Sequence, residues 1–330
     1  MTVRAASQLT ELNAPEYRQP MKRTLFPILV GAILASAPQA QCEVAYGVTL
    51  FGELIRFDTA APGVILSTQA ITGLTGQASG EAISAIDFRP ANGLLYALGN
   101  APGGTTGIYR LYTLDITTGV AARVGATDFT TFVGTFFGFD FNPQVDRIRV
   151  VSDGETNVRL NPIDGMLAGT DTAITPAGDL VAVAYDRNDN LTGTLTTLFG
   201  IDSTSNSLVR IGGVDGTPSP NGGTVTTIGP LGVDSVGRDH FDISAITGVA
   251  YAALTLPGVG GNASTTTNLY TVNLTTGTAV SLGTVGDGTV PVRAFAVTVP
   301  EPTAIGLLAC SGLLLGGMMR RRRAGLAAQS

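Results

Sequence analysis

Between residues 45 and 299 the chain alternates short apolar stretches with turn-forming residues, and no span shows sustained helical periodicity. Five of the apolar stretches end in Asp or Asn: Leu54–Asp58, Leu111–Asp115, Asn157–Asn161, Leu198–Asp202 and Leu269–Asn273. A residue that favours the left-handed conformation follows four or five positions later, namely Gly63, Gly119, Gly165, Asn206 and Gly277. Because Asp or Asn accepts backbone N–H bonds to open a turn and Gly or Asn closes it, the pattern predicts five β-hairpins of one design.

A second pattern, an Asp between apolar residues, falls between these hairpins. It occurs at Asp87, Asp140 and Asp242, with a degenerate copy at 184–187. Each Asp begins a further hairpin, whose return strand carries Tyr96, Arg149 or Tyr251 nine residues later. Joining the two patterns predicts four-stranded units at about 82–125, 136–169, 180–213 and 240–283.

Two segments at opposite ends of the body remain incomplete. The hairpin at 45–67 lacks a leading strand, and the strand at 292–299 lacks a following hairpin. Pairing the last strand with the first hairpin closes a ring, which removes the exposed sheet edges of an open array. We therefore predict an all-β domain over 42–299, a five-bladed β-propeller, with the Gly/Thr/Pro-rich stretch 214–236 forming a long loop or part of a sixth blade. A β-helix or a pair of sandwiches is the structural alternative.

Several sequence runs in this body match one protein family. They are IDFRPANGLLYAL from residue 86, FGFDFNPQVDRIRVVSD from 137, NVRLNPIDG from 157, LGVD from 231 and LYTVNLTTGTAVSLG from 269. The body resembles the bacterial domain of unknown function 4394 family. That resemblance implies a secreted protein with propeller-like repeats and brings no established activity.

The N-terminal segment has the layout of an export signal. Met21-Lys22-Arg23 opens a basic region, the apolar run 25–37 follows, and small or polar residues continue to Gln41. This order predicts a secretory signal peptide at 21–41, preceded by a non-native extension at 1–20. A buried apolar helix is the alternative.

The C-terminal segment, 300–330, has three parts. Val299-Pro300-Glu301-Pro302 precedes the uncharged stretch 303–319, and the arginines 320–323 follow it. The tail resembles the PEP-CTERM sorting signal, which implies recognition at Val299, Pro300, Glu301 and Pro302 by an exosortase. Arg320, Arg321, Arg322 and Arg323 would hold the end of the membrane segment on the cytoplasmic side. An ordinary C-terminal anchor is the alternative.

These two ends predict export in a Gram-negative bacterium. The expected location is the periplasm, the outer surface or the extracellular matrix, with transient anchoring in the inner membrane before processing. The expected partners are the export machinery, the exosortase and a polysaccharide or other envelope component.

Composition narrows the function classes. The 330 residues include one His and two Cys, and both Cys (Cys42 and Cys310) lie in or beside the segments expected to be processed. A disulfide framework and a His-rich metal cluster are therefore excluded. Residues 41–299 carry 22 acidic and 11 basic residues, and a net charge of −11 repels a phosphate backbone. No nucleic-acid partner is expected.

Candidate ligands for a cation are few. Asp87, Asp140 and Asp242 hold equivalent repeat positions, so they can converge near one face of a propeller. There they would bind Ca²⁺ or act as an acid/base pair; the structural interpretation is that each caps its own turn. Asp186, Asn188 and Asn190 resemble half a calcium loop but lack its Gly and its bidentate Glu, which favours a hairpin tip. No cofactor or metal is assigned.

Other polar residues suggest binding rather than catalysis. Arg147 and Arg149 share a strand face and would grip a carboxylate or an acidic sugar, unless they pair with internal Asp residues. His240 has no Gly-x-Ser-x-Gly partner, which argues against a serine hydrolase. Tips near Tyr96, Tyr109, Asn142 and Tyr251 are predicted ligand contacts.

Together these features predict an exported binding or structural propeller associated with exopolysaccharide. The alternative is a calcium-assisted carbohydrate-active hydrolase that uses the three repeat carboxylates.

Overall fold

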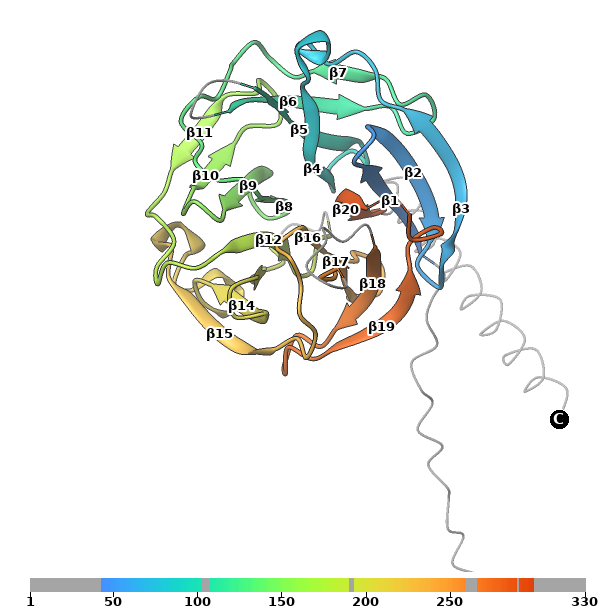
Figure 1. The fold of residues 1–330 in the computed structure, drawn as a ribbon. Coiled ribbons are helices and arrows are strands. Elements are labelled where there is room, and N and C mark those ends of the chain that lie inside the picture. The colour runs from blue at the N-terminus through green and yellow to red at the C-terminus, as the bar shows by residue number, and fades with distance from the viewer. Residues whose placement is uncertain (1–42, 103–106, 190–192, 259–265, 290, 300–330) are drawn as a thin grey trace, which may run out of the picture. The chain divides into compact units, whose positions relative to one another are not determined.

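A computed structural model describes residues 43–102, 107–189, 193–258, 266–289 and 291–299. These residues form a β-propeller of five four-stranded antiparallel sheets arranged around a central channel (Figure 1). The predicted all-β, five-bladed fold is confirmed, and the β-helix and sandwich alternatives are wrong. No helix among the described residues is long and apolar enough to cross a membrane.

Each blade runs from an inner strand beside the channel to an outer strand at the rim. Blade A is β20 (Val292–Val297), β1 (Val44–Thr49), β2 (Glu53–Asp58) and β3 (Ala61–Ala70). Blade B is β4 (Ala82–Phe88), β5 (Leu95–Ala101), β6 (Ile108–Leu114) and β7 (Ala121–Arg123). Blade C is β8 (Phe137–Asn142), β9 (Arg147–Ser152), β10 (Asn157–Leu160) and β11 (Leu167–Thr170). Blade D is β12 (Leu180–Tyr185), β13 (Leu198–Asp202), β14 (Ser207–Ile211) and β15 (Val225–Pro230). Blade E is β16 (Asp239–Ile243), β17 (Ala250–Thr255), β18 (Thr267–Val272) and β19 (Ala279–Thr284).

The ring is closed by strands from the two ends of the body. β20 pairs antiparallel with β1, from Ala45 opposite Val297 to Thr49 opposite Val292. The last strand is therefore the inner strand of the first blade, as predicted from the absence of a leading strand before the first hairpin. Closure pairs the inner edge of β1, which would otherwise be open.

The hairpin turns follow the predicted chemistry in four of five cases. Asp115 Oδ1 accepts the backbone N–H groups of Thr117 and Thr118, and Gly119 closes the turn with φ of 75°. Gly165, Asn206 and Gly277 are also left-handed. The prediction for Gly63 is wrong: it lies within β3, because β2 and β3 join through a tighter turn with Asp58 opposite Ala61.

The stretch 214–236 belongs to neither a sixth blade nor a plain loop. It contains β15, which pairs with β14 and forms the outer strand of blade D. Two short 3-10 turns, Val214–Gly216 and Pro220–Gly222, come before it. The third predicted unit, 180–213, therefore extends to residue 230.

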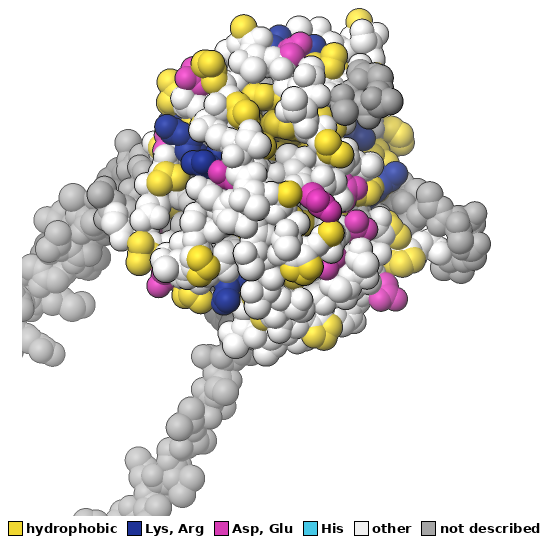
Figure 2. Space-filling model, turned by 90° about the vertical axis from the view of Figure 1, so that its left-hand side faces the viewer, with side chains coloured by type: hydrophobic (Ala, Val, Ile, Leu, Met, Phe, Trp, Pro, Cys, Tyr) yellow, Lys and Arg dark blue, Asp and Glu magenta, His cyan; other side chains and the backbone are white. Residues whose placement is uncertain are grey.

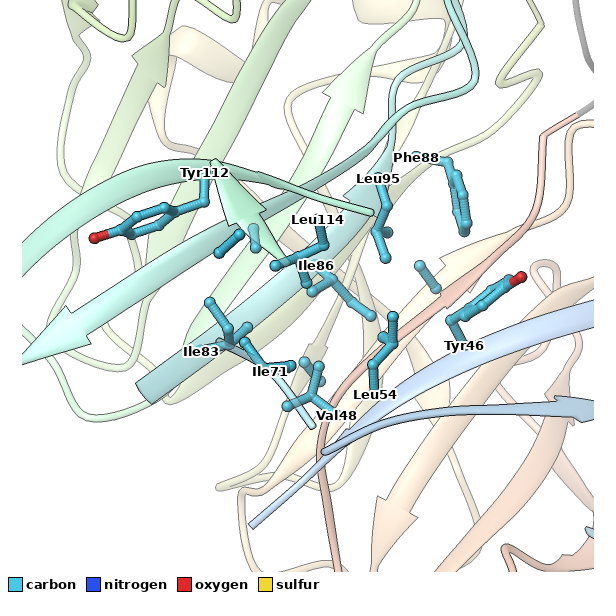
Figure 3. Close-up of a cluster of buried hydrophobic side chains, with 14 of the residues drawn as sticks. Tyr46, Val48, Leu54, Ile71, Ile83, Ile86, Phe88, Leu95, Tyr112 and Leu114 are labelled. Carbon is cyan, nitrogen blue, oxygen red and sulfur yellow. The ribbon is translucent and has the colours of Figure 1, made fainter. Parts of the chain in front are cut away.

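The hydrophobic core is divided among the blade interfaces. Between blades A and B, Tyr46, Val48 and Leu54 pack against Ile83 and Ile86 (Figure 3). Four further clusters lie at the B–C, C–D, D–E and E–A interfaces. Each fully buried aliphatic side chain contributes roughly 1.5–3 kcal/mol, so packing holds the ring together without a disulfide.

Candidate functional site

The inner strands bring three carboxylates together in the channel. Asp87 of β4, Asp140 of β8 and Asp242 of β16 each offer an oxygen within 4.8 Å of the others. Their exposed fractions are 2%, 1% and 3%. The repeat positions thus converge, in a buried setting rather than on an open face.

Backbone N–H groups of the inner strands occupy most of these carboxylate oxygens. Asp87 accepts bonds from Phe88 N and Phe141 N, both at 2.7 Å. The remaining bonds run from Ile243 N and Val297 N to Asp242, both at 2.6 Å, and from Tyr185 N to Asp140 at 2.9 Å. Each inner strand therefore donates one N–H to the cluster.

The distribution of the five bonds explains why only three blades carry an Asp. Asp87, Asp140 and Asp242 each accept the N–H of the next blade around the ring. Ala184 on β12 and Ala296 on β20 hold the equivalent positions. The next Asp around the ring therefore accepts a second bond, from the N–H of the residue that follows it in its own strand. Asp242 accepts the N–H of Ile243 in this way, and Asp87 accepts that of Phe88. Three carboxylates thus satisfy five buried donors, and of their oxygens only Asp140 Oδ2 accepts none of the five bonds.

The electrostatics of the trio favour bound protons. Burial, reinforced by the charge of Asp242, raises the pKa of Asp87 well above its usual value. Burial and the charges of Asp87 and Asp242 do the same for the pKa of Asp140. The pKa of Asp242 rises to about 6, mainly through burial. The channel can therefore hold the trio partly protonated at neutral pH.

This geometry does not support the calcium-assisted hydrolase. Calcium takes roughly six to eight oxygen ligands, whereas the trio offers three carboxylates, five of whose six oxygens already accept N–H bonds. A glycosidase needs its carboxylates to flank a bound sugar. The channel void that lies beside the inner strands, lined by Ala85, Gly138 and Ala182 among others, measures only about 10 Å³.

The second group of predicted ligands is occupied by local bonds. Asp186 Oδ1 accepts the backbone N–H of Thr197 at 2.6 Å and lies 3.0 Å from an Arg187 nitrogen. Asn188 is buried, and Asn190 lies outside the described residues. The Asp186 carboxylate therefore bonds within its own hairpin, to Thr197 and Arg187.

The aromatic contacts predicted at the strand tips are wrong. Tyr96, Tyr109 and Tyr251 are buried in the blade interfaces at 4%, 2% and 2% exposure. Their rings pack in the core because they lie on strands that face the next blade, and the Tyr96 hydroxyl donates to the Pro162 carbonyl. Asn142, from the same set, lines a pocket.

That pocket, the arginine pocket, is a cavity of about 350 Å³ lined from blades C and D. Its lining includes Arg147, Arg149, Arg159, Asn142, Tyr185 and Asn221. Arg149 and Arg159 face each other across the β9–β10 ladder. Arg159 is not among the residues predicted from sequence, although the register of the hairpin places it opposite Arg149.

Two of these arginines share a single acid, which offsets one of their two charges. Asp171 bonds to Arg149 at 2.5 Å and to Arg159 at 2.8 Å. Although burial opposes its charged form, the hydrogen bonds from Arg159 and Arg149 hold the pKa of Asp171 below its usual value. Arg149 also donates to Asn157 and Asn221, both at 2.6 Å.

Arg147 differs from its neighbours in the pocket. It donates to the backbone carbonyls of Asp146 at 2.7 Å and Val145 at 3.4 Å. Within the described part of the chain it has no carboxylate partner, because the Asp146 side chain binds Arg89 of blade B. The pocket therefore carries two positive charges in excess.

Elsewhere on the rim, one acid again pairs with two arginines. Arg110 and Arg123 both bind Asp128, at 2.8 and 2.5 Å. Figure 2 shows the ring from the side, with basic and acidic side chains interspersed among apolar and uncharged ones. The unpaired arginine in the pocket departs from this arrangement.

Comparison with known proteins places the chain in a family. The model for "Domain of unknown function (DUF4394)" matches residues 53–296. The chain belongs to the DUF4394 family. No curated protein matches it. A crystal structure of a protein from Lactobacillus plantarum is similar at 11% identity, covering 78% of this chain and 99% of the other, with a TM-score of 0.39.

Most of the predicted processing residues cannot be placed. Pro300, Glu301, Pro302 and the arginines 320–323 lie outside the described residues, as do the predicted signal peptide and membrane segment. Val299 is the last described residue, and it packs against the core between blades A and B. The folded body thus extends up to the start of the predicted sorting motif.

Proposed function

We propose that this DUF4394 propeller is an exported binding protein that holds an acidic polysaccharide in the arginine pocket. The observation that carries the proposal is Arg147, whose guanidinium lines a cavity of about 350 Å³ without a carboxylate partner among the described residues. A guanidinium fork is suited to the planar carboxylate of a uronic acid.

The other lining groups suit a sugar. Asn142, Gln144 and Ser219 contribute amide and hydroxyl groups that both donate and accept hydrogen bonds. Sugar hydroxyls need such partners when they leave water. The volume falls within the ordinary range for small-ligand sites, roughly 300–1,000 Å³, and it suits one or two sugar rings rather than a long chain.

The pocket supports binding without hydrolysis. Its acid, Asp171, is held charged between Arg149 and Arg159 and has no proton to donate. A glycosidase needs a second carboxyl group as its acid. No carboxyl group is among the lining residues that the structure describes, which favours recognition over hydrolysis.

Export and processing form the cellular part of the proposal. The predicted signal peptide, the tail that resembles a PEP-CTERM signal and the absence of a cysteine pair from residues 43–299 all support a secreted body. Recognition by an exosortase would release that body near exopolysaccharide. Mass spectrometry of the mature protein tests this part: termini near residues 37–42 and 300 support it, and an intact chain contradicts it.

The binding part is tested with short oligogalacturonates, using the neutral oligomers of galactose as the comparison. Isothermal titration of the purified body should show binding of the acidic oligomers only. Arg147→Gln should weaken it about 10- to 100-fold, because a charge-assisted hydrogen bond contributes about 1.5–3 kcal/mol. Arg210→Gln is the matched control, since Arg210 lies on β14 outside the pocket lining. Equal binding of both oligomers, or an unchanged affinity in Arg147→Gln, would contradict the proposal.

A further inference from the structure

A second pocket lies toward the opposite end of the inner strands. The arginine pocket contains Asn142, where β8 ends, whereas this cavity of about 260 Å³ contains Phe137, where β8 begins. Its lining includes Arg238 just before β16, His240 in β16 and Arg293 in β20. We call it the channel-mouth pocket. The carboxylate trio lies further along the same inner strands, beyond the channel's narrow part.

Its two arginines lack neutralising partners. Within the described ranges, neither Arg238 nor Arg293 forms an ion pair, although the eight pairs found there use most other arginines of the body. Burial and the charge of Arg238 lower the pKa of Arg293. Asp239 alternates to the other side of β16, where its Oδ2 bonds to Ser235 at 2.6 Å. Two like charges thus share one cavity.

His240 forms the inner wall of this pocket. The equivalent inner-strand positions are Ala85, Gly138, Ala182 and Ala294, so the imidazole is the one large side chain at this level of the channel. The four small residues leave open space in the channel beside the imidazole of His240. The same imidazole lines both the pocket and the narrow channel below it.

The imidazole presents an acceptor. The ring donates to the Val292 carbonyl, while Nε2 is buried without a hydrogen-bond partner among the described residues. Nδ1 is therefore the donor. Burial and the nearby Arg293 lower the pKa of His240 to about 3, so the ring is neutral and Nε2 carries a lone pair. A buried acceptor without a partner destabilises the empty pocket, and a bound O–H group would satisfy it.

We propose that the channel-mouth pocket binds a small oxyanion that also carries an O–H group. The anionic oxygens would bind Arg238 and Arg293, and the O–H would donate to His240 Nε2. Hydrogen phosphate has both features, and so has a 2-hydroxycarboxylate such as glycolate. Sulfate and acetate have the charge but no O–H donor at neutral pH.

The experiment uses the fact that His240 is the only histidine of the 330-residue chain. In untagged, ¹⁵N-labelled protein, the imidazole nitrogens give one pair of signals that report directly on the pocket. Phosphate is titrated at constant ionic strength with chloride as the balancing anion. We expect a saturable shift of the Nε2 signal, with binding about tenfold weaker for sulfate because one hydrogen bond is lost.

Three variants and the carboxylate arm complete the test. Arg293→Gln and Arg238→Gln should each weaken phosphate binding about tenfold or more, while Arg210→Gln, which removes the same charge on β14, should leave it unchanged. A stronger response to glycolate than to phosphate would identify a hydroxy acid as the better ligand; the reverse order would identify phosphate. Two results would overturn the proposal: no saturable shift with either anion, or equal responses to phosphate in the wild type and both pocket variants.

Discussion

Asp87 Oδ2 on β4 accepts the backbone N–H of Phe141 on β8 at 2.7 Å, so a side chain of blade B completes the hydrogen bonding of blade C. The same relationship joins Asp140 to Tyr185 of blade D and Asp242 to Val297 of blade A. In a closed ring, these bonds link the inner strands where they come closest. The channel carboxylates therefore stabilise the contacts between neighbouring blades.

Asp140→Asn should stabilise the protein above neutral pH. Asp140 accepts one backbone N–H, which an Asn carbonyl can also accept, and the new amide can donate to the carboxylates of Asp87 and Asp242. Removing one of three neighbouring charges also relieves repulsion. We expect the free energy of unfolding at pH 8 to rise by about 1 kcal/mol, measured by urea denaturation.

Asp87→Asn is the matched comparison. Asp87 accepts two N–H bonds, from Phe88 and Phe141, and Asn offers only one oxygen. One buried donor loses its partner, so this variant should be less stable than Asp140→Asn by about 1–3 kcal/mol. Equal stabilities of the two variants would contradict the assignment of these bonds.

Stability should fall as the pH rises above 6.5. The raised pKa values of Asp87 and Asp140 mean that the native state holds protons that the unfolded state has released. Because the native state then binds more protons, the free energy of unfolding declines with increasing pH. His240, whose pKa is lowered to about 3, acts in the opposite direction below its unfolded value of 6.5 and is neutral in both states above it.

Urea denaturation at pH 6.5, 7.5 and 8.5 measures this slope. Asp140→Asn should flatten it, since one of the proton-binding groups is gone. A slope that is zero in the wild type, or identical in the variant, would show that the trio does not titrate as proposed.

Phe295→Ala should weaken ring closure. Phe295 is 3% exposed on β20 and packs beside Phe57, with ring centroids 6.2 Å apart. Truncation of a buried Phe costs about 3–5 kcal/mol, and here it also opens the interface of blades E and A. Phe51→Ala, at a side chain that is 76% exposed, is the control and should change the melting temperature little. Similar losses in both variants would contradict this view of closure.

Asp171→Asn should destabilise the protein more than Asp128→Asn. Each acid bridges two arginines, but Arg149 beside Asp171 is 2% exposed, whereas Asp128 itself is 40% exposed. Removing a partner from a buried charge costs about 3–5 kcal/mol, and a surface pair contributes at most about 1 kcal/mol. Thermal unfolding of the two variants measures the difference, and a larger loss in Asp128→Asn would contradict it.

The sequence pattern predicted the propeller correctly because each of its signals depends on residues close together in the chain. The Asp–Gly turns, the strand lengths and the unpaired strand at 292–299 each depend on a few neighbouring residues. Together they favoured a ring of blades closed by the last strand. Predictions of which side chains are exposed to solvent were less successful. Tyr96 and Tyr251 were expected at tips, yet blade packing buries them, and the pattern could not show which strand face meets the next blade.

The order of strands around the ring and the meeting of equivalent Asp positions follow from residue spacing along the chain itself. Whether those carboxylates are open or buried depends on how closely five inner strands approach, and that is a property of the packed blades. The pairing state of Arg147 and Arg238 is also decided in three dimensions, because the acids next to them in sequence, Asp146 and Asp239, bond to Arg89 and Ser235 instead. The sequence gives the number of charged residues, whereas the folded structure decides which of them lie too far from an opposite charge to form an ion pair.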